Sequence, residues 1–158
     1  MKQENTHKLQ NSWIIWVHDL YDTNWDINSY KKIYEFNTIE DFWVFFNNKD
    51  AISSFDNYMY FLMKTNIPPI WENKCNINGG AYSYIISKNS AKQAWIKLCI
   101  KLIGETLTHD DILHGTSYSP KPNISIIKIW NKNSSIQCNL NINVDVKIRY
   151  KAFKEKNF

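Results

Sequence analysis

Apolar residues fall in short runs along the chain, and the spacing within each run predicts strands in its first half. The segment "SWIIWVH" at residues 12–18 is aromatic and β-branched, which is typical of a buried strand. The segments "SYKKIYEF" at residues 29–36 and "DNYMYFLMK" at residues 56–64 indicate two further strands. The Pro68-Pro69 pair removes backbone donors and enforces extended geometry, so we expect the third strand to end before it.

Three more strands are predicted in the second half. Asn78-Gly79-Gly80 is a turn signal that leads into "AYSYIIS" at residues 81–87. The segment "ISIIKIW" at residues 124–130 predicts another strand, and "INVDVKIRYKAF" at residues 142–153 adds a last one. The connection before residue 124 is polar and contains a candidate helical turn, "HDDILHG", at residues 109–115.

Two apolar runs have helical spacing. Each follows a pair of polar residues three apart, as in a capping box: Asn37 with Glu40, and Ser90 with Gln93. The predicted helices span about residues 38–48 and 91–105, with Gly104 as the C-cap of the second. The predicted strands outnumber the predicted helices. This predicts an α+β fold, in which a curved antiparallel sheet has helices on one face. We expect a single domain over residues 1–158, with residues 1–6 and 154–158 as flexible ends.

Composition narrows the class of protein. An aromatic fraction of 15% exceeds that of disordered chains and indicates a packed core. The formal charge of +4 is too small to indicate a nonspecific nucleic-acid binder, although it allows a local basic patch. The three cysteines have no CxxC spacing, and the sequence has neither a signal peptide nor an apolar run long enough to cross a membrane. We therefore expect a soluble protein of the cytoplasm.

Catalytic and metal-binding motifs are missing from the sequence. His109, Asp110, Asp111 and His114 lie close together, but their spacing matches no metal-ligand pattern, so a solvated turn is the preferred interpretation. Nucleophile elbows, zinc-protease motifs, phosphate-binding loops and dinucleotide fingerprints do not occur. We therefore expect a protein that is not an enzyme and needs neither a metal nor a cofactor.

Three of the seven tryptophans stand where binding sites gather rather than where a core is expected. Trp25 lies in the polar segment "YDTNWDINS", Trp71 follows the proline pair, and Trp130 ends a strand. Glu72 follows Trp71 directly. Trp43, on the first predicted helix, could be core or could bury against another protein.

The order of these motifs resembles that of the eukaryotic translation initiation factor 4E family, the proteins that bind the mRNA cap. The matching segments are "HKLQNSWIIW", Trp25, "NTIEDFW", "PPIWE" with "NGG", "AWIKLCIKLIGE" and "IIKIW". The resemblance covers about residues 7–130 and resumes at "VKIRY". It implies a strongly curved antiparallel sheet, with the ligand on its concave face and helices on its convex face.

The resemblance also assigns roles in cap binding. The ligand it implies is 7-methylguanosine with its triphosphate, as in capped mRNA or 7-methyl-GTP. Trp25 and Trp71 would stack on the methylated base, Glu72 would accept hydrogen bonds from the edge of the base, and Trp130 would lie near the N7-methyl group. Because the loop around Trp25 differs in length from the family pattern, Tyr21 is an alternative stacking residue.

The phosphate-binding positions depart from the family pattern. Ala81 and Ile126 stand where the family has an arginine and a lysine, whereas Lys121 matches a family arginine. Lys128 lies two residues after Ile126 and would share its face on a regular strand, so it is a candidate substitute. Further contacts to the first transcribed nucleotides could come from Tyr82, Tyr84, Tyr118 and Arg149.

The resemblance implies a second binding surface on the convex side, for a helical motif carried by a scaffold of the initiation factor 4G type or by a repressor. The matching positions are His7, Leu9, Ile39, Glu40, Trp43 and Ile96. Lys97 reverses the charge of a family glutamate there, which suggests a partner with an acidic residue or weak binding of the usual one. We expect a monomer that promotes translation; a cap-binding repressor and an interaction module with a decayed cap site are the alternatives.

Overall fold

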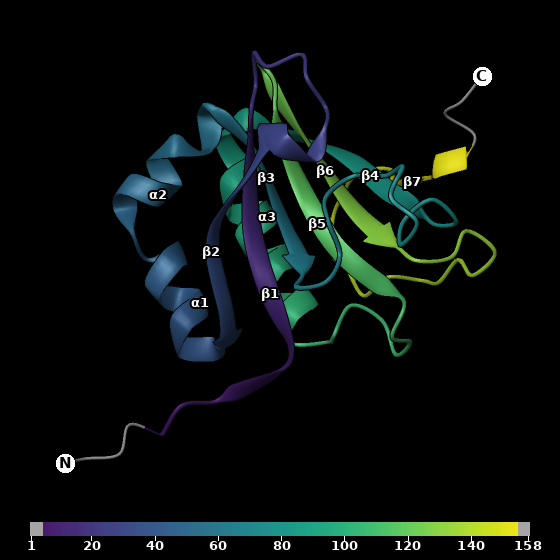
Figure 1. Cartoon of the computed structure of the whole chain (residues 1–158), viewed down its shortest axis with the longest axis horizontal. Helices are drawn as coiled ribbons and strands as arrows, with labels where there is room; N and C mark the ends of the chain where they lie inside the picture. Colours follow the sequence, from purple (N-terminus) through teal and green to yellow (C-terminus); the bar gives the residue numbers. More distant parts are fainter. Residues whose placement is uncertain (1–4, 155–158) are drawn as a thin grey trace.

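The computed structural model describes residues 5–154 and shows one curved sheet with helices on its convex face (Figure 1). The strands are β1 (Lys8–Asp19), β2 (Tyr30–Thr38), β3 (Tyr58–Lys64), β4 (Gly80–Ser87), β5 (Leu113–Pro120), β6 (Ile124–Asn131) and β7 (Arg149–Ala152). The helices are α1 (Ile39–Phe46), α2 (Lys49–Ser53) and α3 (Lys88–Ile103), with short 3-10 turns at Ile27–Ser29 and Ser54–Asp56. The expectation of flexible ends concerns chiefly residues 1–4 and 155–158, which lie outside the described residues.

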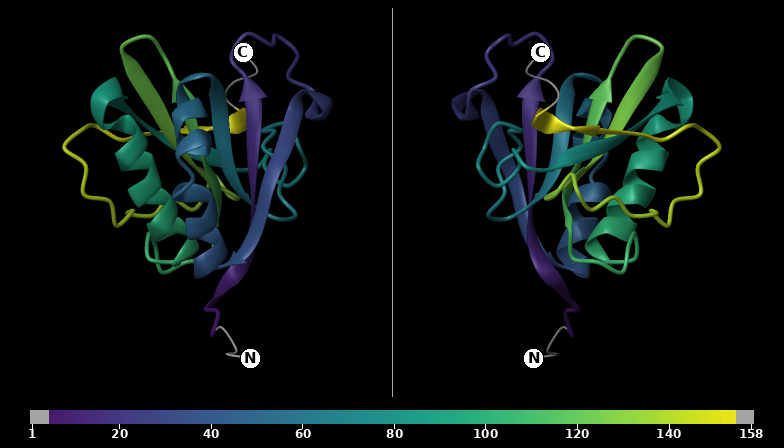
Figure 2. Two further views of the ribbon diagram at one scale, coloured as in Figure 1. Left: turned by 90° about the vertical axis from the view of Figure 1, so that its left-hand side faces the viewer. Right: turned by 90° about the vertical axis from the view of Figure 1, so that its right-hand side faces the viewer.

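The seven strands pair in the order β2-β1-β3-β5-β6-β4-β7, and every pair is antiparallel. The three helices lie together against one face, as the two side views show (Figure 2). The predicted α+β class, the antiparallel sheet and the placement of the helices are therefore confirmed.

Strand β1 shows why the central strands are apolar at almost every position. Alternate residues of a strand point to opposite faces of its sheet. Trp13 and Ile15 belong to the large core between sheet and helices, whereas Ile14 and Trp16 belong to a smaller cluster on the other face. The concave face is thus partly covered, which leaves its open part as a defined site rather than a bare sheet.

The prediction for residues 109–123 was wrong. Residues 109–111 form bends rather than a helical turn, and Leu113–Pro120 form the central strand β5 between β3 and β6. The strand "LHGTSYSP" contains Gly, Ser, Thr and Pro, which individually give a weak strand signal. Pairing on both sides satisfies its backbone groups and overrides that weak propensity.

The helix boundaries also differ from those predicted. Thr38, not Asn37, caps α1, because its side chain accepts a hydrogen bond from the Asp41 backbone N–H. Helix α3 begins at Lys88, so Ser90 lies within its first turn and does not cap it, whereas Gly104 is the C-cap as predicted. Helix α2 was not predicted from the sequence.

The C-terminal part of the chain is less regular than predicted. Of the strand expected at residues 142–153, only Arg149–Ala152 pairs, with β4. Residues 132–148 form an irregular connection along the side of α3.

Candidate functional site

A pocket of about 450 Å³ opens on the concave face of the sheet. Strands β3, β5 and β6 form its floor, and the loops after β1, β3 and β5 form its walls. It is lined by Trp25, Tyr30, Met59, Phe61, Pro69, Trp71, Glu72, Ser117, Ser119, Lys121, Ile126, Lys128, Trp130 and Phe153. All six side chains that the sequence assigned to ligand binding are in this set.

Trp25 stands at the rim of the pocket, on the loop between β1 and β2. Its side chain is 52% exposed, and its ring stacks on the buried ring of His18 with centroids 4.2 Å apart and planes inclined by 7°. His18 Nε2 lies 2.7 Å from the carbonyl oxygen of Asn24, which can only accept, so Nε2 carries a proton. His18 thereby fixes both the loop and the face of Trp25. The alternative residue Tyr21 is 91% exposed and lies outside the pocket lining.

Trp71 and Glu72 reach the pocket from the loop between β3 and β4. Trp71 is half-buried against Phe153, with ring centroids 6.3 Å apart, and Glu72 is exposed. Burial, with a smaller contribution from the Glu72 carboxylate, raises the pKa of Tyr30 to about 12. The carboxylate therefore stands close to a ring that lines the same pocket.

A buried asparagine holds this loop in place. The Asn76 side chain donates hydrogen bonds to the backbone carbonyls of Pro68 and Ile70, each at 2.9 Å. Its Oδ1 lies 2.8 Å from Nδ1 of the buried His114 on β5, which donates to it. The loop is therefore tied to the centre of the sheet, and Asn76 is a positioning residue that the sequence did not reveal.

Trp130 forms the floor of the pocket. It is buried on β6, its indole N–H donates to the Ser117 hydroxyl at 3.3 Å, and its ring meets Phe61 and Phe153 nearly edge-on. These contacts fix the indole, so it can contact a ligand without changing its rotamer.

Two of the lining residues are lysines at one end of the pocket. Lys121 is exposed in the β5–β6 turn, whereas Lys128 is half-buried on β6, on the same face as Trp130 and Ile126, as the sequence predicted for a regular strand. Burial, followed by the charges of Lys121 and Lys151, lowers the pKa of Lys128. Lys121 and Lys151 thus each lie close enough to Lys128 to repel its charge.

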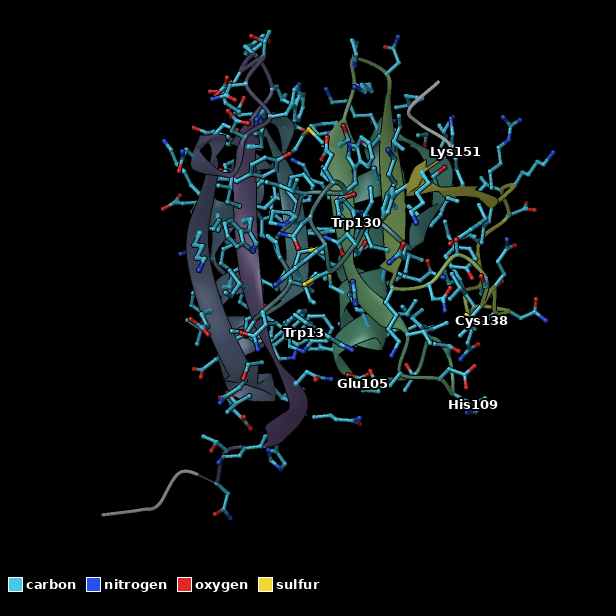
Figure 3. The ribbon with its side chains drawn as sticks, turned by 45° about the vertical axis from the view of Figure 1, so that its right-hand side comes forward. Trp13, Glu105, His109, Trp130, Cys138 and Lys151 are labelled. Atoms are coloured by element: carbon cyan, nitrogen blue, oxygen red, sulfur yellow. The ribbon has the colours of Figure 1, made fainter. Side chains whose placement is uncertain are left out.

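Lys151 occupies a position that the sequence analysis did not single out. Ala81 on β4 pairs with Trp130 of β6 on one side and with Lys151 of β7 on the other. Trp130 and Lys151 are labelled in Figure 3. Directly paired residues share a face, so Lys151 lies on the same face as Ala81, the position at which the resemblance implies an arginine. Only the strand register reveals this, because Ala81 and Lys151 are far apart in the sequence.

Three of the candidates for contacts to further nucleotides are wrong as ring contacts, because their side chains point into the core. Tyr82, Tyr84 and Tyr118 are buried in the core beneath the helices. Even-numbered residues of β4 point to that face, whereas Ala81 and its odd-numbered neighbours point to the concave face. Arg149, the fourth candidate, is exposed.

The predicted partner surface lies on the convex side, and we call it the dorsal surface: His7, Leu9, Ile39, Glu40, Trp43 and Ile96. Trp43 is 38% exposed although it lies among apolar residues of α1, and Val44 of α1 and Ile100 of α3 are exposed as well. Both Glu40 oxygens are engaged by His7, through its backbone N–H at 2.9 Å and its ring at 2.6 Å. The hydrogen bonds from His7 lower the pKa of Glu40 to about 2.

The sequence cluster of His109, Asp110, Asp111 and His114 is not a shared site. Asp111 pairs with Lys64 at 2.7 Å, whereas His114 points to Asn76 inside the sheet. Within residues 5–154 no three His, Cys, Asp or Glu side chains are arranged to hold a metal ion. None of the helices in that range has the length and apolar character that a membrane span requires.

Comparison with known proteins decides the family. The family model for eukaryotic initiation factor 4E matches residues 8–157. The chain belongs to the eukaryotic initiation factor 4E family. Initiation factor 4E of Dictyostelium discoideum is 31% identical over 132 residues, which are 80% of this chain and 52% of that protein. Initiation factor 4E-1 of Arabidopsis thaliana is 28% identical over 96% of this chain and 65% of its own length. The chain therefore spans about half to two-thirds of the length of these 4E relatives.

Solved structures of the family share the fold. The complex of C. elegans eIF4E-3 with the 4E-binding protein Mextli and cap analog is 23% identical, with a TM-score of 0.82 over 96% of this chain and 95% of that one. Ascaris suum eIF4E-3 with m7G cap is 25% identical, with a TM-score of 0.72 over 82% and 76% of the two chains. The family consists of cap-binding proteins rather than enzymes.

Proposed function

We propose that this protein binds the 7-methylguanosine cap of mRNA in the concave pocket. The observation that carries the proposal is that two tryptophans and a glutamate, delivered by two separate loops, line one pocket: Trp25 from the first loop, Trp71 and Glu72 from the second. Membership of the 4E family supports the same ligand.

The chemistry of the pocket suits a methylated guanine. Methylation at N7 gives the base a delocalised positive charge, which an indole face attracts by stacking and cation-π interaction. The Watson-Crick edge of guanine presents two N–H donors, and the exposed Glu72 carboxylate can accept both. Trp130 would lie beneath the N7-methyl group.

The triphosphate would lie toward the lysines. Lys121 and Lys128 line the same pocket as the two stacking residues, so one ligand can reach both groups. Burial and the neighbouring lysines disfavour the charged form of Lys128, and an anionic ligand beside it would offset this effect. No metal ion or cofactor enters this scheme.

Retention on 7-methyl-GTP resin tests the proposal. We expect the protein to be retained at low salt and to be eluted by 7-methyl-GTP but not by GTP. The variants Trp25→Ala and Trp71→Ala should each bind 7-methyl-GTP more weakly by about 1–3 kcal/mol, because each loses one stacking partner. Absence of retention at low salt would show instead that the fold serves as an interaction module with a decayed cap site.

On the dorsal surface we propose that a helical peptide docks with its apolar face on Trp43, so that the protein recruits a scaffold of the 4G type to capped mRNA in the cytoplasm. Helix-in-groove recognition of this kind needs exposed apolar anchors, and Trp43, Val44 and Ile100 supply them. We propose that the protein acts as a monomer outside that complex.

A cap-binding repressor is the second candidate function. Two residues favour it: Glu40 of the dorsal surface, and Lys97, which follows Ile96 of that surface. Lys97 is exposed on α3 where the family has an acid, and Glu40 is already engaged by His7. The surface therefore offers few free carboxylate oxygens to the basic residue of a usual scaffold motif. Tethering the protein to a reporter mRNA separates the two roles: increased translation supports scaffold recruitment, and decreased translation supports repression.

A further inference from the structure

Three rows of side chains cross the concave face between β6 and the β7 edge of the sheet. The register of β4 with its two neighbours defines them, because directly paired residues share a face. The rows are Trp130, Ala81 and Lys151; then Lys128, Ser83 and Arg149; then Ile126 and Ile85.

In the first two rows the side chain in the middle is short, and the side chains at the two ends are long. Ala81 and Ser83 are small, whereas Lys128 stands on the β6 side and Lys151 and Arg149 stand on the β7 side. We call this feature the β4 trough. It exists because β4 carries small residues between two strands that carry long cationic ones.

A second cavity, of about 420 Å³, lies along the trough. It is lined by Ser83, Tyr84, Ile85, Ile126, Lys128, Val146, Lys147 and Arg149. Ile126 and Lys128 also line the proposed cap pocket, so the second cavity begins where the phosphate end of the first one stops. A chain leaving the cap pocket past Lys128 would enter the trough.

The cations along this path are not held in ion pairs with acidic side chains of the described residues. The three ion pairs within residues 5–154 involve Glu40, Asp111 and Asp56, and none includes Lys147, Arg149 or a lysine of the trough. Uncompensated cations along one groove favour a polyanion with charges at regular spacing.

The trough also exposes apolar side chains between its cations. Ile85 is 54% exposed and Val146 is 39% exposed, and both line the second cavity beside Arg149. Single-stranded RNA presents this combination, because each nucleotide pairs an anionic phosphate with a base that has an apolar face.

We infer that the β4 trough binds the first nucleotides of the RNA that follow the cap. The inference rests on the proposed cap-binding function, since the cap would direct the RNA chain past Lys121 and Lys128. Arg149 and Lys147 contact phosphates, and a base lies on Ile85 and Val146. Affinity for capped RNA therefore exceeds affinity for the cap alone.

Two ligands and one double variant test the inference. Wild type and Lys147→Gln/Arg149→Gln are titrated with 7-methyl-GTP and with a capped RNA of about six nucleotides, over a range of salt concentrations. Each phosphate contact on single strands changes log K by about 0.7 per decade of salt, so two contacts contribute roughly 25-fold at 0.1 M salt relative to 1 M. We expect the double variant to lose about that factor for capped RNA, and to retain wild-type affinity for 7-methyl-GTP.

Two further variants sharpen the test. Lys49→Gln/Lys88→Gln removes two exposed lysines from the helices, and should leave both affinities unchanged apart from a small general effect of charge. Ile85→Ser should weaken the binding of capped RNA several-fold without altering the affinity for 7-methyl-GTP. Because Ile85 is exposed, this substitution leaves the fold intact.

The experiment distinguishes failure of the cap-binding proposal from failure of the trough inference. If wild type does not bind 7-methyl-GTP, the proposed function itself is wrong. If wild type binds 7-methyl-GTP but binds capped RNA no more tightly, or if Lys147→Gln/Arg149→Gln and the helix control behave alike, the cap proposal stands and the trough inference is overturned. An acidic peptide that binds wild type but not the double variant, with capped RNA unaffected, would assign the trough to a protein partner.

Discussion

Asn76→Ala tests how the structure positions Trp71 and Glu72. The substitution removes three hydrogen bonds of 2.8–2.9 Å from a side chain that is fully buried. A buried hydrogen bond contributes roughly 0.5–1.5 kcal/mol net, and each partner left unsatisfied costs more. We therefore expect a loss of about 3 kcal/mol in the free energy of unfolding.

The loss should appear both in stability and in binding. For a domain of this size, 1 kcal/mol lowers Tm by roughly 2–4 °C, so Asn76→Ala should unfold about 6–12 °C below wild type. Because the released carbonyls belong to Pro68 and Ile70, the damage falls on the loop that carries Trp71 and Glu72. The substitution should favour a released conformation of the loop over the native one. Affinity for 7-methyl-GTP should fall about tenfold for every 1.4 kcal/mol by which the released conformation becomes more stable than the native one.

Asn78→Ala is the matched control, since it makes the same chemical change two residues later at an exposed position. Thermal unfolding followed by circular dichroism, and 7-methyl-GTP titration followed by tryptophan fluorescence, measure the two effects. The reasoning is refuted if Asn76→Ala has the same Tm as Asn78→Ala. It is also refuted if Asn76→Ala loses stability but binds 7-methyl-GTP with wild-type affinity well below its Tm.

Three further outcomes are expected. Glu72→Gln should reduce the preference for 7-methylguanosine over adenine-type caps more than it alters the salt dependence of binding, as competition on 7-methyl-GTP resin would show. Burial lowers the pKa of His114 from 6.5 to about 4, so the unfolded state takes up a proton first as the pH falls below about 6.5. Stability should therefore drop by about 2 kcal/mol between pH 7 and pH 5 in denaturant titrations, and His114→Gln should lose most of this pH dependence. Trp43→Ala should abolish capture of a dorsal helical peptide in a pull-down while leaving 7-methyl-GTP affinity unchanged.

The strands that the sequence revealed are those rich in aromatic and β-branched residues. β1 and β6 were predicted because their runs are aromatic and β-branched, and the structure covers both of their faces. β5 was missed because Gly115, Thr116 and Ser117 owe their place to pairing with β3 and β6 rather than to propensity. Long-range pairing of this kind cannot be deduced from a local pattern.

The candidate site shows the same division. Trp71 and Glu72 were found because a loop position makes their residue types unusual, and because the order of motifs resembles a known family. Asn76 and Lys151 escaped notice because their roles depend on partners far away in the chain, His114 and Ala81. Neither residue belongs to a recognisable motif, so only the fold reveals what it does.

Ala81 is best understood as a change in where positive charge is placed. An arginine at this position, as the resemblance implies for the family, would stand in the middle of the sheet between Trp130 and Lys151. Alanine leaves that space open and leaves the cations on the flanking strands, where they face each other across a gap. A central cation holds one phosphate group, whereas two cationic walls accommodate a continuing chain of them. If the cap and the following RNA bind as we propose, the alanine that removes one phosphate contact also leaves room for the RNA that continues from the cap.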